Sequence, residues 1–168
     1  MKIGKSMSRR SMRLFAFLLL SASFLPAGCQ TVPLQGGVNE RGEKIYLTPV
    51  NQIEKAIADF SRSKDISTDD GKINYLIERV RQSKLSLIRN NAIYTSSEAA
   101  EFLRWKLNRP RWRPLVHTAQ DFVTVVAGGS ITSGLSYRIV YGKNEHRNLK
   151  DILQNELDFL NAHMPKLA

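Results

Sequence analysis

The chain has 168 residues, and its 25 Lys and Arg against 15 Asp and Glu give a formal net charge of +10. A single cysteine excludes an intramolecular disulfide and a zinc site built on cysteines, so we expect a core held by apolar packing and no cofactor. Five of the basic residues and none of the acidic ones lie in residues 1–28. The remaining 140 residues carry 20 bases against 15 acids, a charge of +5, and suffice for one domain.

Residues 1–28 have the pattern of a secretory signal. Basic residues and no acids occupy the stretch from Met1 to Arg13, and an apolar run follows from Leu14 to Leu25. Because a membrane-spanning helix needs about 20 apolar residues, this shorter run predicts a cleaved leader. The small residues before Cys29 resemble a bacterial lipoprotein signal, in which Cys29 is lipidated and begins the mature chain. The alternative is simple cleavage that leaves Cys29 as a free thiol.

The signal predicts a protein of the bacterial cell envelope, anchored to a membrane by lipid on Cys29 and facing the periplasm. Gln30 stands where inner-membrane lipoproteins typically carry Asp, which favours the outer membrane. Residues 29–47 are predicted to be the lipidated cysteine and a flexible tether, and residues 48–165 a single globular domain. A basic domain in this compartment suits anionic lipid, glycan or another envelope protein as partner, whereas nucleic acid is not expected.

Apolar periodicity and capping residues predict the elements of the domain. The sequence predicts helices over 48–62, 67–83, 95–107, 118–127 and 148–160, and strands over 85–88, 92–94 and 137–141. Thr95 and Glu98 form a capping-box pattern at the third helix. The expected fold class is therefore α+β, a helix-dominated single domain with a small two- or three-stranded antiparallel sheet.

Several spaced motifs resemble an uncharacterised family of small bacterial periplasmic proteins that is known only as a domain of unknown function. The motifs are Ile88-Arg89-Asn90, Tyr94, Glu98-Ala99-Ala100, Leu103, Thr118-Ala119, Asp121-Phe122-Val123, Ser133-Gly134 and Tyr137. The resemblance covers roughly residues 49–160 and implies a fold and an envelope location, but no activity. Asn91, Phe102 and Leu85 stand where the family often has Gly, His and Cys, so a mechanism built on that His or Cys could not operate here.

A basic segment forms the first candidate site. Arg109, Arg111 and Arg113 surround Trp112, and Pro110 and Pro114 are expected to hold the segment extended. Guanidinium groups bind phosphate and carboxylate bidentately, and an indole face stacks on sugars or cations. The alternative is a solvated loop whose Trp112 folds back onto the core.

Polar residues near predicted turns form the second candidate, a pocket with Arg89 as an anion contact. Its members are Arg89, Asn90, Tyr94, Ser130, Ser133 and Tyr137. The alternative is that these side chains satisfy the hydrogen bonds of their own turns.

Catalytic and metal-binding motifs are not expected in this chain. Its three histidines share no ligand spacing, and Gly129-Ser130 lacks the second glycine of a nucleophile elbow. We therefore expect a non-enzymatic binding or interaction module. Two alternatives remain: a hydrolase-like enzyme that acts on cell wall or lipid through residues 128–137, and a structural subunit of an envelope assembly. A histidine bonded to Ser130 would favour the enzyme, and a bare apolar patch on the last helix would favour the structural subunit.

Overall fold

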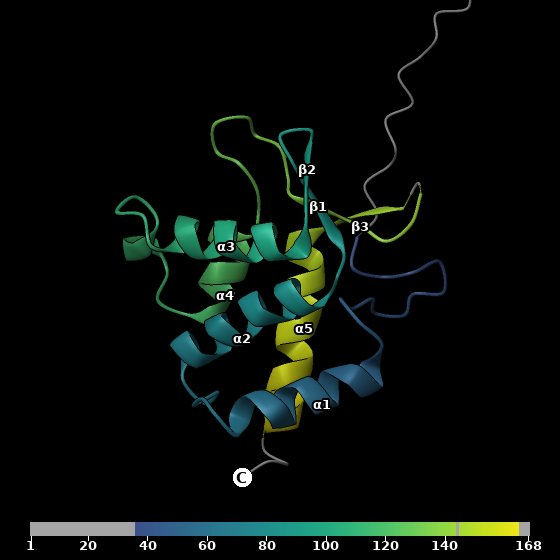
Figure 1. Ribbon diagram of the computed structural model, residues 1–168, viewed down its shortest axis with the longest axis vertical. Helices are drawn as coiled ribbons and strands as arrows, with labels where there is room; N and C mark the ends of the chain where they lie inside the picture. The colour runs from purple at the N-terminus through teal and green to yellow at the C-terminus, as the bar shows by residue number, and fades with distance from the viewer. Residues whose placement is uncertain (1–35, 144, 165–168) are drawn as a thin grey trace, which may run out of the picture. The chain divides into compact units, whose positions relative to one another are not determined.

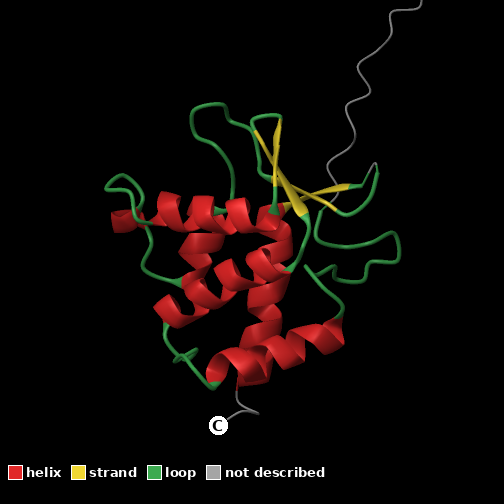
Figure 2. Cartoon of the chain, viewed as in Figure 1, coloured by secondary structure: helices red, strands yellow, loops and turns green. Residues whose placement is uncertain are grey.

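Helices dominate the computed structural model, which describes residues 36–143 and 145–164 (Figures 1 and 2). The α-helices are α1 (Val50–Ser61), α2 (Asp69–Gln82), α3 (Ser96–Leu107), α4 (Ala119–Asp121) and α5 (Leu149–His163). A 3-10 turn, η1 (Arg113–Leu115), precedes α4, and a π-helical turn, η2 (Phe122–Val126), continues it. The helix-dominated α+β fold predicted from the sequence is confirmed.

Side-chain caps explain where three of the helices begin. The hydroxyl of Thr68 accepts a hydrogen bond from the backbone N–H of Gly71 at the start of α2. Thr95 forms a complete capping box with Glu98 at α3, and Thr118 forms one with Asp121 at α4. These contacts satisfy N–H groups that the first turn of a helix leaves free.

The sheet is antiparallel and has four strands in the order β2-β1-β3-β4. The strands are β1 (Ser86–Arg89), β2 (Ala92–Tyr94), β3 (Arg138–Val140) and β4 (His146–Asn148). Asn90 and Asn91 have φ values of 49° and 64° and make the tight turn between β1 and β2. The predicted count of two or three strands was too low. β4 has no apolar residue, so hydrophobic alternation does not reveal it.

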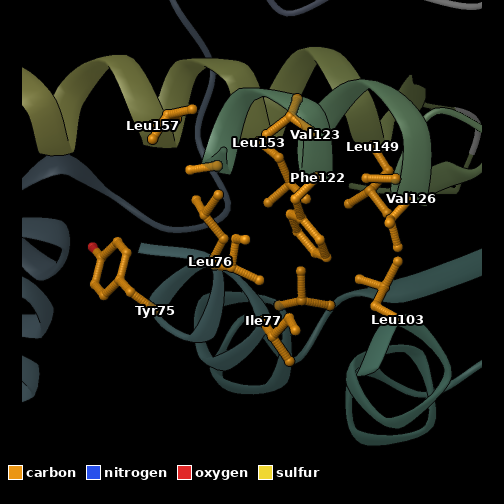
Figure 3. Packing of buried hydrophobic residues seen from close by; sticks show 14 of the residues in the cluster. Tyr75, Leu76, Ile77, Leu103, Phe122, Val123, Val126, Leu149, Leu153 and Leu157 are labelled. Carbon is orange, nitrogen blue, oxygen red and sulfur yellow. The ribbon is translucent and has the colours of Figure 1, made fainter. Parts of the chain in front are cut away.

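The core lies between α2, α3, the α4–η2 segment and α5. Figure 3 shows the ring of Phe122 at its centre, between Leu76 and Ile77 of α2 and Leu153 of α5. All four of these side chains are completely buried. α1 packs against α2, where the ring of Phe60 meets that of Tyr75 edge to face with centroids 5.5 Å apart. No helix within residues 36–143 and 145–164 has the length and apolar character needed to cross a membrane.

The structure describes residues 36–47 of the expected tether, here called the arm. These residues are bound to the domain. Nδ2 of Asn155 in α5 donates to the carbonyls of Gly37 (2.6 Å) and Ile45 (2.8 Å). Nη1 of Arg147 in β4 donates to the carbonyl of Gly36 (3.0 Å). The domain therefore includes residues before 48, because side chains of α5 and β4 bind a segment that has no apolar pattern of its own. Cys29 and the leader lie outside the described residues.

Candidate functional site

Five of the predicted site residues line one cleft, although they come from three separate parts of the chain. They are Arg89 at the end of β1, Arg111 and Trp112 after α3, and Ser130 and Tyr137 before β3. The cleft has a volume of about 150 Å³, and its other lining residues are Phe102, Trp105, Lys106, Ile131 and Thr132. We call it the cationic cleft. The cleft thus brings together Arg89 and Tyr137, two members of the predicted pocket.

Lys106 is the most deeply buried cation of the cleft, with only 2% of its surface exposed. Its Nζ donates to the carbonyls of Val126 and Gly129, both at 2.7 Å, and lies 3.3 Å from the hydroxyl of Tyr137. The last turn of a helix leaves its carbonyls without partners, and a cation satisfies them. Lys106 therefore binds the end of η2 and fixes the start of the 128–137 loop.

Arg89 stacks on an aromatic row carried by α3. Its Cζ lies 4.1 Å from the ring centroid of Phe102, and Phe102 stacks in turn on Trp105 with centroids 5.8 Å apart. The residues are three apart on the helix, so their rings lie on one face. Nε of Arg89 is buried and has no hydrogen-bond partner among the described residues. A buried donor of this kind is costly unless a ligand or water accepts from it.

Positive charge in the cationic cleft is not neutralised by its own lining. Arg89, Lys106 and Arg111 contribute three cations, and no Asp or Glu stands among the lining residues, all of which are described. Burial, together with the nearby charge of Arg89, lowers the pKa of Lys106 to about 8. Burial also raises the pKa of Tyr137, which keeps its hydroxyl neutral. The arrangement favours an anion over a cation or a neutral ligand.

The basic segment is not the extended finger that its prolines suggest. The backbone N–H groups of Trp112 and Arg113 both donate to the carbonyl of Arg109 at 2.9 Å, so the segment coils into helical turns. This coil directs the three arginines differently. Arg111 lines the cleft, while Arg109 stacks on the outer Trp105 with its Cζ 4.1 Å from the ring centroid. Arg113 instead lies 3.5 Å from the carboxylate of Asp70.

The other predicted pocket residues lie outside the cleft lining. The hydroxyl of Ser133 donates to Oδ1 of Asn90 at 2.7 Å and joins the 128–137 loop to the β1–β2 turn, side by side at the top of Figure 2. Tyr94 is half-buried and packs against the core. The Ser133 hydroxyl also accepts from the N–H of Leu135 in its own turn at 3.4 Å, as the alternative expects, whereas the bond of the Asn90 side chain runs to a second turn.

The features set out for the two alternative functions are not seen in the described part of the chain. Ser130 bonds to Ser133, Gly134 and Leu135, and no histidine is among its partners there. None of the large exposed apolar side chains of the described residues belongs to α5. No group of three His, Cys, Asp or Glu side chains within residues 36–143 and 145–164 could hold a metal ion.

Three cleft residues, Phe102, Trp105 and Lys106, were missed as site residues because they fall inside a predicted helix. Lys106 follows the buried Leu103 by three residues, so it lies on the apolar face. A lysine in that position was a usable signal, because buried lysines are rare unless they have a specific role.

One of the comparisons with known proteins gives a match. Residues 67–161 match the model of a family described as "Family of unknown function (DUF5329)". The match covers more than half of the chain, so the protein belongs to this family. Neither the curated proteins nor the solved structures give a match. The resemblance to a domain of unknown function is thereby confirmed, and α2 through most of α5 lie inside it.

Proposed function

We propose that this member of the DUF5329 family is a non-enzymatic anion-binding module of an envelope lipoprotein, and that the cationic cleft is its binding site. The observation that carries the proposal is the unpartnered Nε of Arg89 in a cleft with three cations and no acid. An anion placed there would accept from Arg89 and balance the charge of Lys106 and Arg111.

The size of the cleft selects one small charged group. Pockets that bind whole drug-sized molecules measure roughly 300–1,000 Å³. At about 150 Å³, the cationic cleft holds a phosphate or carboxylate group and little else. Guanidinium groups bind both groups with short, charge-assisted hydrogen bonds. Lys106 has its donors directed at carbonyls, so its contribution is charge, while Arg89 supplies the directional contact.

The envelope location rests on the sequence of residues 1–29. The basic start, the short apolar run and the small residues before Cys29 support export and lipidation. Equal incorporation of labelled lipid into the wild-type chain and a Cys29→Ser variant would exclude lipidation at this residue.

Titration with inorganic phosphate tests the site. Arg89→Gln removes the charge and the Nε donor, and we expect it to lower phosphate affinity about tenfold, as loss of a charged hydrogen bond does. Arg113→Ala is the matched control, since it also removes one arginine but from outside the cleft. Binding is followed by the NMR shift of the indole N–H of Trp112, which lines the cleft.

Two outcomes would contradict the proposal. One is a wild-type protein that shows no saturable shift with phosphate or with acetate. The other is an equal loss of affinity in Arg89→Gln and Arg113→Ala, which would mean that phosphate responds only to overall charge.

A further inference from the structure

Apolar side chains exposed to solvent border the cationic cleft. Trp105, Leu115 and Ile131 are 50%, 54% and 58% exposed, and we call these three residues the apolar rim. Trp105 and Ile131 line the cleft itself. Ile131 and Leu115 also line an adjoining groove of about 680 Å³, which shares Trp112 with the cleft. The rim is therefore continuous with the cleft around Trp112.

The combination of rim and cleft fits a bilayer surface better than a soluble anion. A free phosphate or a sugar phosphate would give Leu115 and Ile131 no partner. At a lipid surface, aromatic and aliphatic side chains enter the headgroup boundary, while arginines meet the phosphates. Arg109, which stacks on Trp105, adds a further cation beside the rim.

The beginning of the described chain lies beside one residue of the adjoining groove. Asp151 lines that groove, and a Cβ on Gly36 would lie 3.9 Å from its Oδ2. Cys29 precedes Gly36 by seven residues, a stretch that spans at most about 25 Å when fully extended. A lipid on Cys29 would therefore hold Gly36, next to the Asp151 part of the groove, within that distance of the membrane.

We propose that the apolar rim docks on an anionic membrane surface and that the cationic cleft then receives the phosphate of one lipid headgroup. This inference rests on the anion site of the proposed function and adds its source, a phospholipid in a bilayer. The membrane is the one that carries the protein's own lipid anchor.

The two tryptophans of the chain make the test direct, because both line the cleft. The full-length protein, purified as the bacterial cell processes it, is reconstituted with vesicles of phosphatidylcholine alone or of phosphatidylcholine with phosphatidylglycerol. Bromine atoms on the acyl chains quench tryptophans that reach the membrane. We expect quenching on the anionic vesicles to exceed that on the neutral ones by a factor of about five, the effect of one arginine near an anionic surface.

Two variants separate docking from anion binding. Leu115→Ser changes an exposed rim residue that lines only the adjoining groove, so we expect it to weaken the quenching and keep the affinity for inorganic phosphate. Arg89→Gln should lose both, and Arg113→Ala should keep both.

Each remaining outcome has a definite meaning. Phosphate binding without quenching on any vesicle would overturn docking and leave the proposed anion site intact. Failure of both measurements would overturn both proposals. Equal quenching on neutral and anionic vesicles would overturn the headgroup contact. If a sugar phosphate competes with inorganic phosphate but phosphatidylglycerol vesicles do not, the site belongs to a soluble ligand and docking is overturned.

Discussion

Lys106 shows how one residue can set up a site without directing its own charge at the ligand. Its ammonium group binds the carbonyls of Val126 and Gly129, so the loop that carries Ser130 and Ile131 starts from a fixed point. Its charge still adds to the positive potential of the cleft, where Nζ lies 4.3 Å from the ring centroid of Trp112. The same group therefore shapes one wall of the cleft and adds to the positive potential on which the proposed anion site depends.

The lowered pKa of Lys106 predicts how stability depends on pH. The pKa falls from 10.5 in the unfolded chain to about 8 in the folded chain. Between these values the unfolded chain holds a proton that the folded chain has released, so the free energy of unfolding rises with pH. We expect a rise of about 1 kcal/mol per pH unit between pH 8 and 9.5 in urea unfolding.

Lys106→Met provides the control for this titration. The carboxylates and the tyrosines that do not contact Lys106 contribute equally to both proteins, and Tyr137, whose hydroxyl lies 3.3 Å from Nζ, has a raised pKa and stays neutral in this range. The difference between the two curves therefore isolates Lys106. A difference that stays constant from pH 7 to 9.5 would show that Lys106 keeps its ordinary pKa in the folded chain.

Two helices distant in the sequence are joined by a buried ion pair. Nε of Arg79 in α2 lies 2.9 Å from Oε2 of Glu156 in α5, with side chains 3% and 0% exposed. Arg79 also donates to the hydroxyl of Thr48 at 2.6 Å, and the carboxylate accepts from the N–H of Leu47 at 2.9 Å. The pair thus fixes the end of the arm at the contact between α2 and α5.

Neutralising one partner should be strongly destabilising. Glu156→Gln leaves the Arg79 cation buried without its counter-charge, and we expect a loss of about 3 kcal/mol in the free energy of unfolding. Asp59→Asn, which breaks the exposed pair with Arg62, should cost about 0.5 kcal/mol or less. Guanidinium unfolding of both variants measures the difference, and similar losses in the two would contradict this account.

Elements with strong local signals were predictable from the sequence, and elements made by long-range contacts were not. α2 and α3 have apolar stripes and threonine caps, so periodicity places them within a few residues of their bounds. β4 depends on pairing with β3. Its central residue, Arg147, lies buried under the arm and donates to the carbonyls of Gly36 and Val38, so no apolar residue marks this strand.

The candidate site was predictable in part for the same reason. Arg89, Arg111, Trp112 and Tyr137 were identified by residue type, because cations and aromatics near turns suit ligands. Their convergence depends on the helical coil of residues 109–115 and on the bond from Lys106 to the carbonyl of Gly129. The position of Lys106 on an apolar helix face marks it as unusual, but the sequence does not show which carbonyls it binds.

At the scale of the whole molecule, the arm is bound to α5 and belongs to the fold. Residues 36–47 form a small hairpin with a bridge between Val38 and Lys44, and α5 binds it through Asn155 and through the ion pair of Lys44 with Asp158. The fold thus extends from the arm to α5, with segments from the two ends of the described chain in contact.

Loss of the Asn155 amide should release the arm while the rest of the domain stays folded. Asn155→Ala removes two hydrogen bonds to the arm, and we expect trypsin to cleave after Arg41 about tenfold faster. Asn74→Ala is the matched control, because the amide of Asn74 donates to the carbonyl of Asp70 within α2 and not to the arm. Equal cleavage rates in the wild type and Asn155→Ala would show that the two bonds do not hold the arm.

The attachment of the arm to α5 also decides how the domain bears mechanical load. A pull on the chain before Gly36 acts first on the hydrogen bonds of Arg147 and Asn155. The load then passes into α5, whose buried leucines spread it over the core. Because these bonds are few, we expect the hairpin to yield before the helices do, so that the arm lengthens under tension while the cleft, formed by other segments, keeps its shape.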